Sequence, residues 1–298
     1  MRKISFVSLL LCAASFCIPR SAPAELVYGL TAQGGLISFD SATPGSVSTV
    51  GNISGASSGQ FFLGIDFRAS NGLLYGLAVN TITGASNIYT INLATAAASL
   101  VGTTPFTLST SIGGRVGMDF DQANDMLRVI TRNGSNYRVN PNAGSLFAQD
   151  TTLTYTGGVP SQTPDSVAIA YAPNSTLYSY TFDFDEFVRI GGVGGMPSAN
   201  GGECFAIGGS GTFPLTSNVG FDISQNGTAY LFDFPNASRF FTVDLATGHA
   251  TLVGPIGGSP QLVSLAVAPV PEPATALLLL GAGLLASGCW IVRRRRAG

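Results

Sequence analysis

The sequence predicts an all-β fold, a five-bladed β-propeller in which one blade is closed by both termini of the domain. Three observations predict it: a motif of about 50 residues recurs along the chain, each copy contains several short strands, and the parts of a further copy stand at opposite ends of the repeated region. No stretch between residues 25 and 269 shows a sustained apolar period of about 3.6 residues, so no helix is expected there.

The repeat emerges when one apolar position of each copy is aligned. Ile65, Met118, Ile169 and Phe221 follow one another at intervals of 53, 51 and 52 residues. Around each lie short segments rich in Val, Ile, Tyr, Phe and Thr, separated by turn residues such as Asn226-Gly227. Four strands in a unit of this length are typical of a propeller blade.

A fifth unit is split between the two ends of the repeated region. Val263–Val267 resembles a first strand and comes 44 residues after the fourth copy. The missing three strands correspond to Leu26–Leu30, Leu36–Asp40 and Ser48–Gly51. One blade built from both segments closes the ring and leaves no exposed strand edge. A β-sandwich is the alternative, but it explains neither the repeat nor the split unit.

The N-terminal residues 1–24 have the three parts of a secretory signal peptide. A positively charged start precedes the apolar run Ile4–Ile18, and the small residues Ala22 and Ala24 form a cleavage site. The apolar run is shorter than the about 20 residues that a membrane span needs. We expect signal peptidase to cleave after Ala24, so that Glu25 begins the exported chain.

The C-terminal residues 270–298 form a second targeting segment. The motif 271–273 is followed by nineteen uncharged residues, 274–292, which can cross the hydrocarbon core of the inner membrane as a helix. The basic tail 293–298 would stay cytoplasmic, which places the body outside. The residues of this signal are Pro271, Glu272, Pro273, Arg293, Arg294, Arg295 and Arg296. A plain C-terminal anchor helix is the alternative.

The order of these three parts resembles the PEP-CTERM sorting signal. The resemblance implies processing by an exosortase-type membrane protease-transpeptidase in an exopolysaccharide-producing Gram-negative bacterium. It also implies an inner-membrane-anchored precursor that is then sorted to the outer cell surface or the extracellular matrix. The body, 25–269, resembles an exported bacterial domain family of unknown function that often carries this tail. That family brings no catalytic residues to this chain.

The charge of the body argues against nucleic acid as a partner. Between Glu25 and Pro273 there are seven arginines and all sixteen acidic residues of the chain, and the single lysine is Lys3. A phosphate backbone is bound by clustered cations. The sequence contains no such cluster in this region.

Two residues of the body are candidates for catalysis or metal binding by their type. Cys204 is the one cysteine between the two apolar ends, so no internal disulfide framework is possible, and we expect a buried thiol. His249 is the one histidine of the chain. It lies in the turn Asp244–His249 without a neighbouring partner for a triad or a metal site, so we expect an exposed turn residue.

Aspartate recurs in the first strand of three units, at Asp66, Asp119 and Asp222. These carboxylates could surround the central channel as metal ligands. However, Ala170 and Ala266 occupy the same position in the other two units. We therefore favour a structural role, in which each aspartate joins a blade to a neighbouring turn.

Three further segments are candidate binding loops. Asp119–Asp125 and Asp183–Glu186 have alternating oxygen ligands but lack the order of residues found in a calcium loop, so solvated turns are expected. Gly191–Gly211 is dense in glycine and lacks the lysine and helix start of a phosphate loop. We expect a long flexible insertion there. No catalytic residue, metal ligand or cofactor is assigned.

The combined expectation is a non-enzymatic protein of the cell envelope or the extracellular polysaccharide matrix, in which the propeller is a display or binding module. Exopolysaccharide is its candidate ligand. The alternative is an extracellular hydrolase or lyase that acts on polysaccharide at the mouth of the propeller channel. The sequence leaves the choice between binding and catalysis open.

Overall fold

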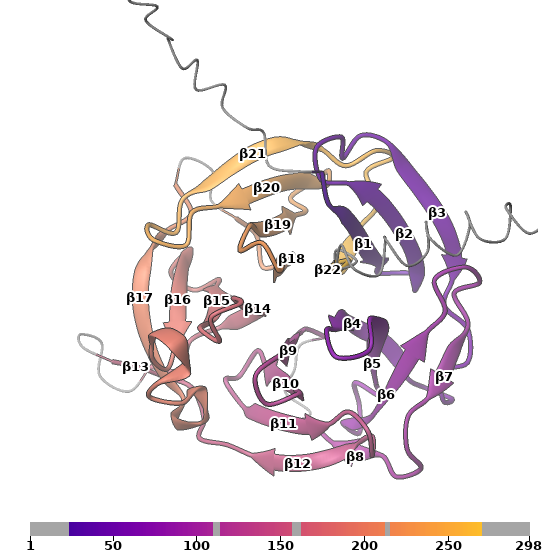
Figure 1. Cartoon of the computed structure of the whole chain (residues 1–298), viewed down its shortest axis with the longest axis horizontal. Coiled ribbons are helices and arrows are strands. Elements are labelled where there is room, and N and C mark those ends of the chain that lie inside the picture. The colour runs from indigo at the N-terminus through magenta and orange to yellow at the C-terminus, as the bar shows by residue number, and fades with distance from the viewer. Residues whose placement is uncertain (1–23, 110–113, 157–161, 212–214, 270–298) are drawn as a thin grey trace, which may run out of the picture.

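The computed structural model describes residues 24–109, 114–156, 162–211 and 215–269, and these form five β-sheets arranged as the blades of a ring (Figure 1). The all-β, five-bladed architecture predicted from the repeat is confirmed. The signal peptide, apart from its last residue, and the segment 270–298 lie outside the described residues. Within the described ranges no helix is long and apolar enough to span a membrane.

Four blades are built from strands that follow one another in the chain. The strands are β4 (Phe61–Arg68), β5 (Leu73–Val79), β6 (Ala85–Ile91), β7 (Ala98–Leu100) and β8 (Phe106–Thr107) in the first of these blades; β9 (Val116–Asp121), β10 (Met126–Thr131), β11 (Asn136–Asn140) and β12 (Ser145–Gln149) in the second; β13 (Thr154–Tyr155), β14 (Ser166–Tyr171), β15 (Leu177–Thr181), β16 (Glu186–Ile190) and β17 (Glu203–Gly209) in the third; and β18 (Val219–Ile223), β19 (Ala229–Asp233), β20 (Arg239–Val243) and β21 (Ala250–Pro255) in the fourth. Each blade is an antiparallel meander, with β8 and β13 as short additions.

The remaining blade contains strands from both ends of the described chain. Its sheet has the order β22 (Leu262–Val267), β1 (Leu26–Thr31), β2 (Gly35–Asp40) and β3 (Val47–Asn52). Leu265 of β22 pairs with Gly29 of β1 in an antiparallel register. The amide of Ala268 donates to the carbonyl of Leu26 at 2.8 Å, so the two ends of the propeller leave it side by side.

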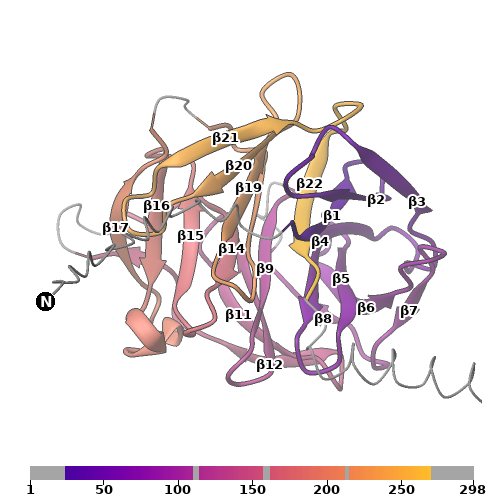
Figure 2. The same ribbon diagram turned by 45° about the horizontal axis from the view of Figure 1, so that its top comes forward.

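The innermost strands of the five blades surround the central channel. They are β22, β4, β9, β14 and β18, and each contacts the next around the ring (Figure 2). The backbones approach closely there, because a Cβ on Gly64 of β4 would lie only 2.7 Å from the side chain of Met118 on β9. Glycine at this position therefore lets the inner strands of two neighbouring blades approach each other closely.

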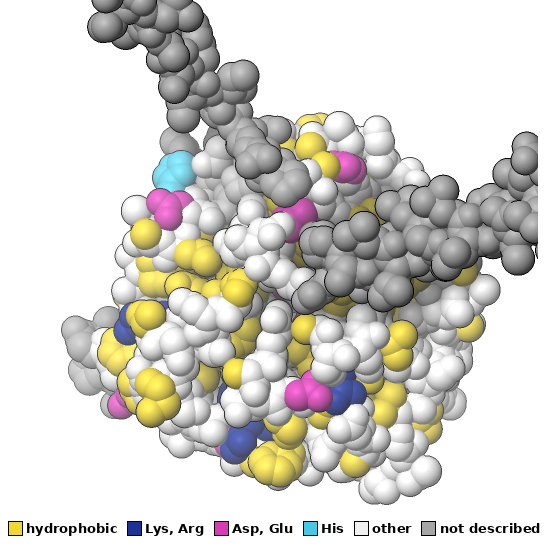
Figure 3. Space-filling view, viewed as in Figure 1, with side chains coloured by type: hydrophobic (Ala, Val, Ile, Leu, Met, Phe, Trp, Pro, Cys, Tyr) yellow, Lys and Arg dark blue, Asp and Glu magenta, His cyan; other side chains and the backbone are white. Residues whose placement is uncertain are grey.

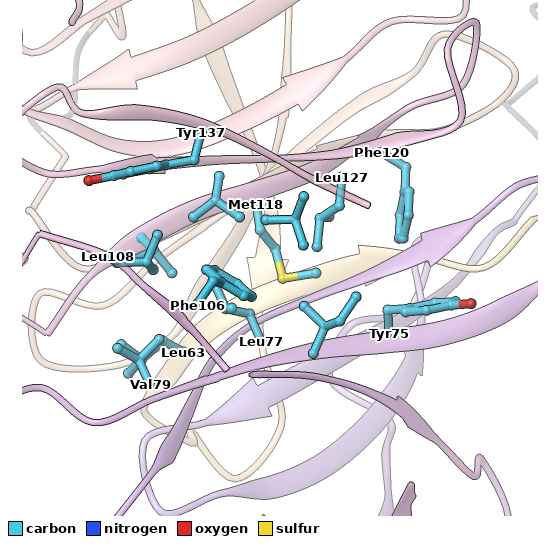
Figure 4. Close-up of a cluster of buried hydrophobic side chains, with 14 residues drawn as sticks. Leu63, Tyr75, Leu77, Val79, Phe106, Leu108, Met118, Phe120, Leu127 and Tyr137 are labelled. Atoms are coloured by element: carbon cyan, nitrogen blue, oxygen red, sulfur yellow. The ribbon is translucent and has the colours of Figure 1, made fainter. Parts of the chain in front are cut away.

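The hydrophobic core is divided into five clusters, each between two neighbouring blades. In the cluster between the β4–β8 and β9–β12 blades, Leu77 and Leu127 face each other across Met118 (Figure 4). Alternation along each strand directs apolar side chains to both faces of a blade, which are covered by the blades on either side. This arrangement explains why the strands read as nearly continuous apolar runs.

The glycine-rich segment Gly191–Gly211 is not the flexible insertion that the sequence suggested. It contains two single helical turns, η1 (Val193–Gly195) and η2 (Ala199–Gly201), followed by β17, which pairs with β16 along its length. A Cβ on Gly208 would lie 2.3 Å from the carbonyl oxygen of Thr247. Glycine here permits close packing against a turn of the next blade, so its abundance reflects crowding as well as turns.

Candidate functional site

The three recurring aspartates meet in the channel. Asp66 on β4, Asp119 on β9 and Asp222 on β18 are all buried, and one carboxylate oxygen of each lies within 4.8 Å of the others. They line a pocket of about 20 Å³, which is room for one water molecule or one monatomic ion. Pro269, the last described residue, lines the same pocket. The chain therefore leaves the propeller at the acidic end of the channel.

Each carboxylate in this pocket accepts a hydrogen bond from a backbone amide of the next blade. Asp66 Oδ2 accepts from Phe120 at 2.8 Å, and Asp119 Oδ1 accepts from Tyr171 at 3.1 Å. Asp222 Oδ2 accepts from the amide of Val267 at 2.6 Å. The donors lie on the inner strands of the neighbouring blades rather than on turns. The structural role favoured from the sequence is thus present, with a strand in place of the turn.

The environment of the three carboxyl groups favours their protonated forms. Burial is the largest cause that raises the pKa of Asp66 and of Asp119 well above the usual range, and the negative charges of the other members add to it. Burial also raises the pKa of Asp222 to about 6, against the opposing effect of its two backbone hydrogen bonds. The Asp119 carboxyl is hydrogen-bonded to that of Asp222, which raises the pKa of Asp119 and lowers that of Asp222.

The cluster is a poor match to a calcium or magnesium site. A hard divalent cation takes about six to eight oxygen ligands, or an octahedral set that includes waters. Both oxygens of Asp66 and both of Asp222 already accept backbone amides. A cation would have to compete with these bonds. The arrangement is better suited to holding the inner strands of neighbouring blades together.

The carboxylate oxygens of the first acidic segment, Asp119–Asp125, do not converge on one point. The Oδ1 atom of Asp121 accepts from the amides of Ala123 and Asn124 within its own turn. Asp125 forms an ion pair with Arg68 of the neighbouring blade, which lowers the pKa of this carboxyl. Because Asp119 instead faces the channel, the three carboxylates of this segment serve three different contacts.

The second acidic segment is also used internally. The Oδ1 atom of Asp185 accepts from the Tyr180 hydroxyl at 2.8 Å and from Ser210 Oγ at 2.7 Å. It also accepts from the amide of Leu215 at 3.2 Å. The Asp185 side chain thus holds the connection between β17 and β18 to the β13–β17 blade, whereas Asp183 in the same turn is exposed, as expected from the sequence.

The two lone residues behave as the sequence predicted. Cys204 is fully buried, and burial raises the pKa of its thiol to about 12, so the thiolate form that reacts is disfavoured. His249 is exposed at the turn before β21, and its amide donates to Thr247 Oγ1 at 3.3 Å. Neither residue supports a nucleophilic or triad mechanism.

A family model decides how the chain is classified. The model described as "Domain of unknown function (DUF4394)" matches residues 35–266, which is most of the propeller. The chain belongs to the DUF4394 family. The match runs from β2 to β22 and includes the three channel aspartates of this DUF4394 domain. A search of curated proteins finds no match.

Solved structures share the fold of the DUF4394 domain at low sequence identity. A protein of unknown function from Bacteroides caccae is 11% identical with a TM-score of 0.53, covering 83% of this chain and 99% of its own. A GH43 glycoside hydrolase engineered in its active site is 12% identical, also with a TM-score of 0.53. That match covers 83% of this chain and 53% of the hydrolase. At such identities the likeness is one of fold alone.

A second model, the PEP-CTERM protein-sorting motif, matches residues 269–296 directly after the DUF4394 domain. This motif is the substrate signal for exosortase and marks a protein for export and membrane-anchored sorting to the cell surface. The residues assigned to it from the sequence, Pro271–Pro273 and Arg293–Arg296, lie outside the described residues. Their individual roles stay predictions.

Cleavage of the signal peptide is expected to leave Glu25 as the first residue of the exported protein. In the propeller its side chain is buried and accepts hydrogen bonds from Tyr230 at 2.8 Å and from Asn226 at 3.1 Å. Mass spectrometry of the exported protein should give an N-terminus at Glu25. Replacing the small cleavage-site residue with Ala24→Leu should block cleavage. An exported wild-type chain that still begins at Met1 would refute the assignment.

Proposed function

We propose that this DUF4394 protein is a non-enzymatic, surface-sorted binding or display module of the cell envelope or the extracellular polysaccharide matrix. Residues 1–24 are its signal peptide, 25–269 its propeller domain and 270–298 its sorting tail. Signal peptidase releases the N-terminus, and an exosortase-type enzyme in the inner membrane processes the tail. The body then reaches the outer cell surface or the matrix, where exopolysaccharide is its candidate partner.

The observation that carries this proposal is the direct succession of the propeller and the sorting motif. Strand β22 ends at Val267, and the PEP-CTERM match begins at residue 269. No spacer separates the last propeller strand from the signal. The propeller is therefore the part of the chain that sorting delivers, and its surface is what the signal presents.

Binding is favoured over hydrolysis by the geometry of the channel. Retaining glycoside hydrolases place their two carboxyl groups about 5–5.5 Å apart, and inverting ones about 6.5–9.5 Å apart, on either side of a sugar. The channel carboxylates instead have oxygens within 4.8 Å, and the pocket holds about 20 Å³. A sugar ring cannot enter such a space. These acids support hydrogen bonding between blades better than acid–base chemistry.

The chemistry of the tail suggests how the signal is read. Pro271 and Pro273 have no backbone N–H and disfavour helix at the residues before them, so an extended segment would present Glu272 at the outer membrane face. The four arginines would keep the following span in register, because insertion of arginine into hydrocarbon costs about 2.5–3.5 kcal/mol each. An enzyme beside the span could then cleave near residue 274.

The test is the fate of the tail. In wild type, the mature surface form should lack the segment from about Ala274 onward. Glu272→Ala should leave an unprocessed precursor in the inner membrane, whereas Glu203→Ala, which removes an exposed carboxylate from β17, should be processed normally. Masses of the protein from inner- and outer-membrane fractions decide the matter. A span retained in the mature wild type, with no effect of Glu272→Ala, would identify a plain anchor.

A further inference from the structure

A groove of unassigned function lies between the β9–β12 and β13–β17 blades. It consists of two contiguous hollows of about 390 and 200 Å³ that share Asp121, Asn124 and Ser198. One wall is the segment with η1 and η2, which lies next to the β9–β12 blade (Figure 1). The larger hollow is within the size range of ligand sites in proteins, and both are far larger than the channel pocket.

An exposed aromatic ring forms one side of the groove. Phe147 on β12 has 60% of its surface exposed, so its ring is accessible to a ligand. The guanidinium of Arg138 lies 5.2 Å from the centre of its ring and is held by two hydrogen bonds of 2.8 Å to Asp150. In the space-filling view, basic and hydrophobic side chains adjoin over β11 and β12 (Figure 3). The ring is thus a supported flat platform.

Buried hydrogen bonds position the polar side chains of the groove. Arg128, which is 2% exposed, donates to Asn200 Oδ1 at 2.6 Å and to the Tyr171 hydroxyl at 2.7 Å. The side-chain nitrogen Nδ2 of Asn200 makes no hydrogen bond to the described part of the chain, so it can donate to a ligand; the backbone amide of Asn200 donates to Ser198 Oγ. Ser198 and Asn124 are exposed and add a hydroxyl and an amide beside it.

The charges of this region cancel. Arg128 and Arg138 both pair with Asp150, at 3.2 and 2.8 Å, and the carboxylate of Asp121 lies in the groove itself. Two guanidinium groups thus face two carboxylates. An anionic ligand would meet Asp121, and a cationic ligand would meet the two arginines. A neutral ligand incurs neither repulsion.

We infer that this groove binds a segment of a neutral polysaccharide. Sugar rings combine an apolar C–H face, which can pack on Phe147, with hydroxyl groups that donate and accept, which match the carboxylate, amide and hydroxyl groups here. Two contiguous hollows suit neighbouring sugars of one chain. This inference rests on the proposed function, because it names the ligand class that the surface-displayed module would hold.

The experiment measures binding of defined oligosaccharides to the exported protein by calorimetry. The neutral probes are cellohexaose, xylohexaose and mannohexaose, and the acidic probe is hexagalacturonic acid. At least one neutral probe should bind, and more tightly than the acidic one. Phe147→Ala should weaken that binding at least about tenfold, and Phe147→Tyr should retain it because the ring remains. Phe61→Ala, which removes a 64% exposed ring outside the groove, should have no effect.

The melting temperature of each variant is measured in parallel, because both phenylalanines are exposed and their removal should leave folding intact. Absence of binding to all three neutral probes would overturn the inference, as would equal effects of Phe147→Ala and Phe61→Ala. Tighter binding of the acidic probe would also overturn it. Failure here is separate from failure of the proposed function, since a protein that is sorted normally but binds no neutral sugar rejects the groove alone.

Discussion

Deletion of Val263–Val267 should abolish the cooperative unfolding transition of the propeller. The segment supplies nearly all of β22, the innermost strand of the blade shared by the two chain ends. Leu265, Ala266 and Val267 are buried in the clusters on the two sides of that blade. Burial of each large apolar side chain contributes about 1.5–3 kcal/mol, and a whole domain is stable by about 5–15 kcal/mol. Loss of the strand removes a comparable amount and exposes the edge of β1.

A point substitution gives a finer test of the same strand. Leu265→Asp places an unpaired charge in a core position that is 2% exposed, whereas Leu252→Asp places the same charge on the outer strand β21, where the residue is 47% exposed. The first should lower the melting temperature strongly and the second slightly. Thermal unfolding followed by circular dichroism compares them. An unchanged melting temperature after the deletion would show that the ring does not depend on β22.

The stability of the propeller should fall as pH rises from about 5 to 8. The folded protein raises the pKa of Asp222 from 3.8 to about 6, and it raises that of Asp66 and Asp119 as well. A carboxyl group whose pKa is raised by folding holds its proton more tightly in the folded state. Its contribution to the free energy of unfolding is therefore complete below pH 3.8 and is lost as the pH passes the folded pKa. At about 1.4 kcal/mol per pKa unit, Asp222 accounts for about 3 kcal/mol over the whole interval from its unfolded to its folded pKa, of which about 1.4 kcal/mol is lost above pH 5.

Asparagine at two of these positions separates the titration of the carboxyl groups from the contribution of their backbone hydrogen bonds. Asp119→Asn keeps an oxygen for the Tyr171 amide and supplies a permanent donor to Asp222, so the pH dependence should flatten and stability at pH 8 should hold or rise. Asp222→Asn loses an acceptor, since both oxygens of Asp222 accept amides. It should cost about 1–3 kcal/mol.

The measurement is the free energy of unfolding in urea between pH 5 and 8. That range lies above the pH at which the carboxyl of Asp125, whose pKa is lowered by Arg68, takes up its proton. A wild type that is more stable at pH 8 than at pH 5 would contradict the assignment. A steeper pH dependence in Asp119→Asn would contradict it as well.

The sequence was sufficient for the blades because each blade repeats a local pattern. The spacing of Ile65, Met118, Ile169 and Phe221 identified the inner strands, which the structure places around the channel as β4, β9, β14 and β18. Strand β17 was missed because its glycines serve tight packing against a neighbouring turn. A scan for apolar alternation cannot distinguish such a strand from a loop.

The sequence predicted part of the channel cluster and none of the groove. The channel aspartates were visible as a repeat position, but their partners were not, because the amides of Phe120, Tyr171 and Val267 come from other blades. The groove left no motif at all. Phe147 and Asn200 are far apart in the chain, and only the packing of two blades places them on one hollow.

The position of β22 also determines how the protein carries mechanical load. Anything that holds the chain beyond residue 269 pulls on this strand first, because Val267 is the last residue of the sheet. Tension must break the ladder between β22 and β1 together with the bond from Val267 to Asp222. Strand β22 lies at the centre of the ring, where it contacts the inner strands of both neighbouring blades. A tether at this end therefore pulls against the propeller's interior, while the outer strands bear none of the first strain.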